Sequence, residues 1–142
     1  MARPAIRGQN GTWSLRQAFT AAQVTERAAR AIVARHLVGP DALTGADVLA
    51  LKVTVALSRC ALLDCDDPIL SNMRDADATR AARDCWYAPT LEMLLVSTSG
   101  ETRLARTAAE LSAVLTVYAD RPVVLLPIGR WALDLQTRTA AA

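Results

Sequence analysis

Two short stretches of helical periodicity, separated by only a few residues, constrain the fold more than any other feature of this sequence. Ser14 suits the N-cap of a first helix, whose apolar face follows the i, i+3, i+4, i+7 pattern: Leu15, Ala18, Phe19 and Ala22. Thr25 suits the N-cap of a second helix over residues 25–36, which Gly39-Pro40 terminates. The apolar residues expected to be buried here are Val24, Ala28, Ala31 and Ile32. The sequence therefore predicts two helices joined by a tight turn.

The composition favours helices in the rest of the chain as well. Apolar residues make up 52% of the 142 residues, enough for a core, whereas aromatic residues make up only 4%. Much of the apolar content is alanine, the best helix former, while strands prefer β-branched and aromatic residues. A chain of this length suits one compact domain, or two very small ones that share a linking helix.

Two longer helices are expected after the first pair. Thr44-x-x-Asp47 resembles a capping box and opens a helix that extends to about residue 63. Apolar residues surround this helix almost completely, so we expect a central spine covered on two sides. A further helix is expected from Pro68 to about Trp86. Its charged residues are expected to face solvent: Arg74, Asp75, Asp77, Arg80, Arg83 and Asp84.

The C-terminal part combines two apolar strands with one amphipathic helix. Strands are expected over residues 91–98 and 122–128. Between them, Ser99-Gly100 is expected to turn into a helix whose apolar stripe steps by four and three residues: Leu104, Ala108, Leu111, Leu115 and Tyr118. A strand, a helix and a strand in this order predict a right-handed βαβ unit with parallel strands. Residues 129–138 fit a strand and a helix equally well.

These elements predict an α+β fold with an all-α helix-turn-helix head, long linking helices and a small C-terminal βαβ unit. The expected division is a flexible basic arm over 1–12, a DNA-binding domain over 13–63, a linking helix over 64–88 and an assembly or partner domain over 89–142. Because so small a sheet is marginally stable alone, we expect it to be covered by the spine helix or by a second copy of the chain, and favour a homodimer. The expected assembly residues are Leu104, Leu111, Leu115, Tyr118 and Trp131.

The charge is distributed unevenly along the chain. The net charge is +2, but residues 1–59 carry +5 and residues 60–142 carry −3. A basic first half joined to an acidic second half indicates that one part meets a polyanion. This first half contains the pair of helices, whose layout is that of a helix-turn-helix, and the second helix of such a motif enters the major groove of DNA with its N-terminal end.

The side chains expected to face outward near that end indicate how DNA would be contacted. Glu26, Arg27 and Arg30 are the candidate base-contacting residues, since arginine can donate to both acceptors of a guanine. Candidate contacts to the DNA backbone or minor groove are Arg3, Arg7, Arg16, Thr25, Arg35 and Lys52. The alternative interpretation is an ordinary surface helix whose arginines keep the protein in solution.

At these positions the chain resembles the DNA-binding domain of MerR-like regulators. The resemblance covers about a third of the chain and rests on three segments: Val24-Thr25-Glu26-Arg27 with Arg30, Leu37-Val38-Gly39-Pro40, and Thr44 to Leu49. It implies a winged helix-turn-helix regulator, of the type found in small actinobacterial and phage repressors, with double-stranded DNA as its partner.

The chain departs from the family pattern at several positions. Gln23 occupies the place of the usual turn glycine, and Ala31-Ile32 replaces the usual aromatic pair. His36 replaces the glycine that ends the recognition helix, and the wing shrinks to residues 40–43. We therefore expect the N-terminal arm with Arg3 and Arg7 to take the place of the wing in the minor groove.

Other classes of function find little support in the sequence. The three cysteines have no metal-ligand spacing, and the acidic run at residues 64–67 lacks the glycine and distal glutamate of a calcium loop. A single histidine, His36, and no phosphate loop or catalytic motif argue against an enzyme. We expect no cofactor, no metal, no catalytic residue and no membrane span, and a cytoplasmic, nucleoid-associated location.

The sequence thus predicts a sequence-specific DNA-binding transcriptional regulator, with a repressor, and a phage immunity repressor in particular, as the favoured form. Two alternatives stay open: an excisionase-like architectural protein that bends DNA, and a protein-interaction module whose helix-turn-helix does not bind DNA. The operator, the inducing signal and any contact with RNA polymerase or a recombinase are not determined by the sequence.

Overall fold

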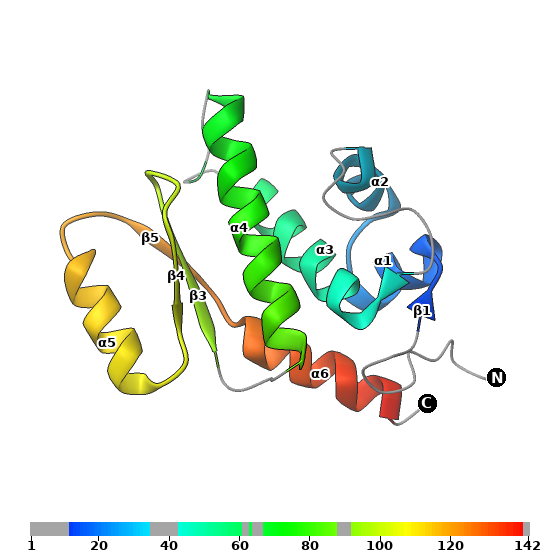
Figure 1. Ribbon diagram of the computed structural model, residues 1–142. Coiled ribbons are helices and arrows are strands. Elements are labelled where there is room, and N and C mark those ends of the chain that lie inside the picture. The colour runs from blue at the N-terminus through cyan, green and yellow to red at the C-terminus, as the bar shows by residue number, and fades with distance from the viewer. Residues whose placement is uncertain (1–11, 35–42, 61–62, 64–66, 88–91, 141–142) are drawn as a thin grey trace.

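Six helices and five short strands are found in the part of the chain that the structure describes (Figure 1). The computed structural model describes residues 12–34, 43–60, 63, 67–87 and 92–140. The predicted mixture of helices and strands is confirmed. Among these residues, no helix has the length and apolar character needed to cross a membrane.

The first two helices and the turn between them form where the sequence predicted them. Helix α1 (Leu15–Ala22) begins at a capping box between Ser14 and Gln17, and helix α2 (Glu26–Ala34) follows after three residues. Gln23 ends α1 in the left-handed conformation, with φ 60° and ψ 40°. The buried positions of α2 differ from the prediction, because Ala29 is buried while Ala31 is exposed.

A two-residue ribbon ties the start of the described chain to the helix that follows. Strand β1 (Thr12–Trp13) pairs antiparallel with strand β2 (Leu43–Thr44). Thr12 therefore belongs to a strand and not to the predicted arm, of which residues 1–11 lie outside the described residues. Trp13 and Leu43 are buried, so the ribbon seals one end of the core.

Helix α3 (Gly45–Ser58) is the central spine that the sequence predicted, although it ends five residues earlier than expected. Thr44 and Asp47 form the predicted capping box, in which each side chain accepts a hydrogen bond from the other residue's backbone N–H. Ten of its fourteen residues are buried. The spine contacts α1 and α2 as well as α4 and α6.

Helix α4 (Pro68–Tyr87) packs along α3 and is less solvated than predicted. Arg74 and Asp75 are buried, whereas the sequence analysis placed them on the surface. Their burial is possible because they pair with each other at 3.0 Å, and Arg74 also donates to the carbonyl oxygen of Leu63. The free energy lost when two charges leave water is offset only if they form an ion pair and their remaining polar atoms are hydrogen-bonded.

The sheet corrects the prediction of a parallel βαβ unit. Strands β3 (Met93–Ser97), β4 (Thr102–Ala105) and β5 (Val123–Leu126) lie in the order β4-β3-β5, and both pairings are antiparallel. Residues 102–105 form a strand because Gly100, with φ 89°, closes a hairpin after β3. Leu104 therefore lies in β4 and not on the predicted helix, which begins only at residue 108 as α5 (Ala108–Val117).

The last element resolves the ambiguity at residues 129–138, since helix α6 (Ile128–Ala140) covers them all. It packs against α3, α4 and β3. Buried residues form one cluster that runs from Trp13 through α3 and α4 to Leu135, and it crosses residues 63 and 88, the predicted domain boundaries. Helix α5 lies on the other side of the sheet, at the opposite end of the molecule from α1 and α2 (Figure 1).

Candidate nucleic-acid interface

The first turns of α2 present a charged, solvent-exposed surface. Glu26, Arg27 and Arg30 are all exposed, and they follow the turn that joins α2 to α1. Thr25 holds the start of the helix, since its hydroxyl oxygen accepts a hydrogen bond from the N–H of Ala28 at 3.2 Å. On its opposite side, α2 buries Ala29 and Ile32 against the core. One face therefore anchors the helix while the other is available to a partner.

Two of these charged residues, Glu26 and Arg30, form an ion pair. Arg30 donates to Oε1 of Glu26 through both Nε, at 3.1 Å, and Nη2, at 2.7 Å. The pair is well exposed, and an exposed i, i+4 ion pair stabilises a helix by only about 0.3–0.5 kcal/mol. Arg30 can therefore exchange Glu26 for a stronger acceptor at small cost.

Arg27 lies between the members of that pair in sequence and has a different environment. Among the residues that the structure describes, Arg27 makes no ion pair and no side-chain hydrogen bond, and it is exposed. Arg16, near the start of α1, is also exposed. Arg16 therefore lies on a helix that contacts α2.

The fold brings only some of the predicted contacts together. Lys52 is partly buried in α3, and its ammonium lies 5.0 Å from the ring centroid of Trp131 in α6. It is thus on the α6 side of the spine rather than beside the exposed arginines of α2. Arg3, Arg7 and Arg35 lie outside the described residues.

No family model, no curated protein and no solved structure matches this chain. The case for any function therefore rests on the side chains themselves. An exposed helix with two arginines near its N-terminal end can bind an anion in two ways. The guanidinium groups can donate paired hydrogen bonds, and the N-terminus of the helix adds a partial positive charge. In the part of the chain that is described, no three metal-ligating side chains come together.

An ion pair that the sequence analysis did not predict joins α3 to α4. Arg83 of α4 donates to the carboxylate of Asp47, which also accepts a hydrogen bond from the N–H of Thr44, the N-cap of α3. Burial by itself would raise the pKa of the Asp47 carboxyl, but hydrogen bonds from Arg83 and Thr44 outweigh burial and hold that pKa below its usual value. The capping motif indicated Asp47, whereas its partner 36 residues away left no signal in the sequence.

The residues predicted to assemble a dimer divide into two groups. Tyr118 is buried, and its hydroxyl donates to Glu101, while Trp131 packs against the core of its own chain. That hydrogen bond raises the pKa of the Tyr118 hydroxyl above its usual value. Leu111 and Leu115, in contrast, remain partly exposed on α5.

Proposed function

We propose that this chain is a sequence-specific DNA-binding regulator that inserts the N-terminal turns of α2 into the major groove. The observation that carries the proposal is the exposed set Glu26, Arg27 and Arg30 on a helix that is anchored through its opposite face. Arginine donates to guanine O6 and N7, and glutamate accepts from cytosine N4, so this set can distinguish base pairs. Thr25 immediately precedes this set, and Arg16 is exposed on the neighbouring helix α1; both would contact phosphates.

The form of the regulator we favour is a repressor, as in a phage immunity system. Binding at an operator is enough to block a promoter, so a repressor requires no site beyond the DNA-contacting surface. The pair of helices and the basic first half of the chain support DNA as the partner. The excisionase-like alternative predicts several adjacent sites on DNA and no effect on a promoter.

The test is binding to the DNA upstream of the protein's own gene, measured by fluorescence anisotropy against scrambled DNA at matched salt. We expect tight binding to the upstream DNA only. Arg27→Ala and Arg30→Ala should each cost about 1–3 kcal/mol, roughly a 5- to 150-fold rise in Kd, because each removes a base contact. Affinity should also fall steeply with salt, since phosphate contacts release counterions.

A matched control is available in α6. Arg130 pairs with Asp134 at i, i+4, and its side chain is 69% exposed, close to the 67% of Arg30. Arg130→Ala removes the same charge from a similar exposed pair and should leave the affinity unchanged. Equal losses of affinity for the upstream DNA in Arg30→Ala and Arg130→Ala would indicate non-specific electrostatic binding. Weak binding to both DNAs, unaffected by any variant, would leave the protein-interaction module as the explanation.

A further inference from the structure

Helix α5 has the composition of a buried helix but is not buried. Glu110 is its only charged residue, and the remaining positions are Ala, Leu, Val, Ser and Thr. None of its ten residues is buried, and Val117 is 68% exposed. A helix that is apolar on all sides is normally enclosed by other parts of a protein. In this chain the sheet covers only one side of α5 (Figure 1).

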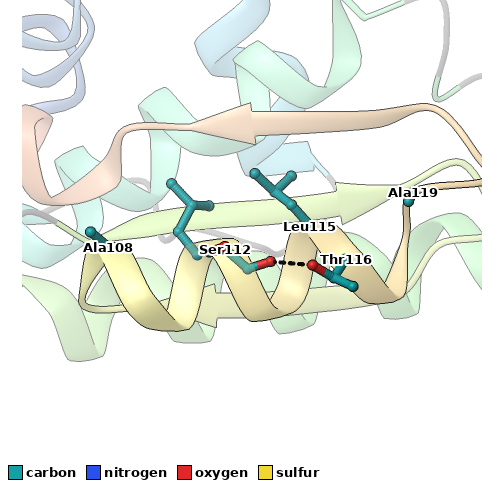
Figure 2. A pocket seen from close by; sticks show the side chains of 6 residues that line it. Ala108, Ser112, Leu115, Thr116 and Ala119 are labelled. Carbon is teal, nitrogen blue, oxygen red and sulfur yellow. Dashed lines mark hydrogen bonds between the residues drawn. The ribbon is translucent and has the colours of Figure 1, made fainter.

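The flank of α5 beside β5 forms an open hollow of about 460 Å³. Six residues line it, and we call them the α5 stripe: Ala108, Leu111, Ser112, Leu115, Thr116 and Ala119. Figure 2 shows Leu115 pointing from the helix toward β5, with Ser112 and Thr116 beside it. Val123 and Leu125 of β5 are themselves only partly buried, so the apolar surface continues onto the edge of the sheet.

We propose that the α5 stripe is the interface of a homodimer, occupied by the same stripe of a second copy. Its side chains form two neighbouring rows at i, i+4 spacing. Leu111 and Leu115 make a ridge, and Ala108, Ser112 and Thr116 make a furrow of small side chains. Under a two-fold axis, the ridge of each copy enters the furrow of the other. Interlocking rows of this spacing give a helix crossing angle near −50°.

The charge of the surface also favours a second copy over an unrelated partner. The stripe carries no charged side chain, so a two-fold axis brings no like charges together, and nothing on it would select an acidic or basic partner. Glu110 lies outside the stripe, where its carboxylate accepts a hydrogen bond from the N–H of Arg106. The other edge strand, β4, differs because it carries the exposed Arg103. A charge of this kind discourages association at a sheet edge.

The size of the surface indicates a weak dimer. A ten-residue helix is about 15 Å long, and burying one flank of it removes on the order of 400 Å² from each copy. The resulting total of about 800 Å², even when the partly buried face of β5 enlarges it, is smaller than the roughly 1,200–2,000 Å² of standard specific interfaces and fits a weak, transient one. We therefore expect a reversible dimer with a Kd on the order of 10–100 μM.

Sedimentation equilibrium of the full chain without DNA, from about 1 μM to about 1 mM, tests the proposal. The wild type should shift from monomer to dimer over this range. Ser112→Glu places a charge at the middle of the stripe and should raise the dimer Kd at least tenfold. Thr116→Arg, at a second exposed position, should do the same. Circular dichroism of each variant checks that the helices still form.

A control on the same helix and a rescue experiment sharpen the test. Ala113→Glu adds the same charge at an exposed position outside the stripe and should leave the dimer intact. Ser112→Arg alone should be monomeric, but mixed with Ser112→Glu it should form a heterodimer, because opposite charges then meet across the axis. A wild type that stays monomeric, or a dimer that Ser112→Glu does not weaken, overturns the proposal. Since DNA is absent, that result would not affect DNA recognition.

Discussion

At the scale of single residues, Gln23 determines how α2 leaves α1. Its left-handed backbone lets the N–H of Gln23 donate to Thr20 and the N–H of Val24 donate to Phe19, which closes the last turn of α1. Both bonds satisfy carbonyl groups that a helix end would otherwise leave exposed. Because the direction of α2 follows from this turn, the position of the exposed arginines depends on one strained residue.

Replacing this residue by glycine should stabilise the protein. A side chain in the left-handed region costs about 1 kcal/mol, and glycine adopts that region without the penalty. We expect Gln23→Gly to raise the free energy of unfolding by about 0.5–1 kcal/mol, measured by urea denaturation. Thr20→Gly, inside α1, should instead lower it by about 0.3 kcal/mol, because glycine has the lower helix propensity. A loss of stability in both variants would contradict the assigned turn.

Gly45 is needed for a different reason, since no positive φ is involved. A Cβ atom built on Gly45 would overlap the indole ring of Trp86, which is fully buried. We expect Gly45→Ala to lower the free energy of unfolding by at least about 2 kcal/mol, because α4 must move away from α3. Combining it with Trp86→Phe tests the cause. The cost of Gly45→Ala should shrink in that background, and a purely additive effect would exclude the clash.

At the scale of elements, the sequence predicted helix starts well and strand pairing poorly. Ser14, Thr25 and Thr44 marked the starts of α1, α2 and α3, because a cap is a contact between residues three positions apart. The Leu104-to-Tyr118 periodicity was misleading, and residues 102–105 joined a hairpin instead. Thr107, which accepts from the N–H of Glu110, was the signal for the true start of α5.

The remaining errors share a physical origin, since they concern contacts between residues distant in sequence. Whether β3 and β5 run parallel or antiparallel depends on the path of the chain between them. The residues within two short apolar strands do not indicate that path. The burial of Arg74 and Asp75 likewise depends on where α4 lies on α3. For the candidate site, the exposure of Glu26, Arg27 and Arg30 agrees with helical periodicity, whereas the position of Lys52 against Trp131 does not follow from it.

The junction between α3 and α4 should show a pH dependence of its own. The depressed pKa of Asp47 means that its carboxylate stabilises the folded state above its ordinary pKa of 3.8. That contribution is lost as the pH falls through the lower folded-state value. We expect Asp47→Asn to lower the free energy of unfolding by about 1–3 kcal/mol at neutral pH. The difference in this free energy between the variant and the wild type should become smaller below about pH 4.

The measurement is the free energy of unfolding of the wild type and of Asp47→Asn, from urea denaturation at about pH 7, 4 and 3. Asp77→Asn is the matched control, because Asp77 forms an exposed i, i+3 pair with Arg80 and should contribute little at any of these values. A gap between Asp47→Asn and the wild type that stays constant with pH would show that the carboxylate does not stabilise the folded state.

At the scale of the whole molecule, α3 joins the two halves of the chain through one continuous hydrophobic core. It contacts α1 and α2 with one side and α4 and α6 with the other, and the buried cluster is continuous across it. We expect a single two-state unfolding transition. The denaturant midpoint for the loss of helicity, measured by circular dichroism, should equal the midpoints at which amides in β3 and in α2 lose their protection from hydrogen exchange. Separate midpoints for α2 and β3 would show that the halves unfold independently.

The burial of Trp86 gives the molecule an optical property. Trp86 is shielded from water at the junction of α3 and α4, and its backbone carbonyl accepts a hydrogen bond from Gln136 of α6. An indole shielded in this way emits at shorter wavelength than one in water. Trp13 lies near α1, in the ribbon with β2, and Trp131 lies beneath the Lys52 ammonium. The three tryptophans thus lie in different surroundings, and a partner that disturbs one region would alter the emission of the tryptophan there without any attached dye.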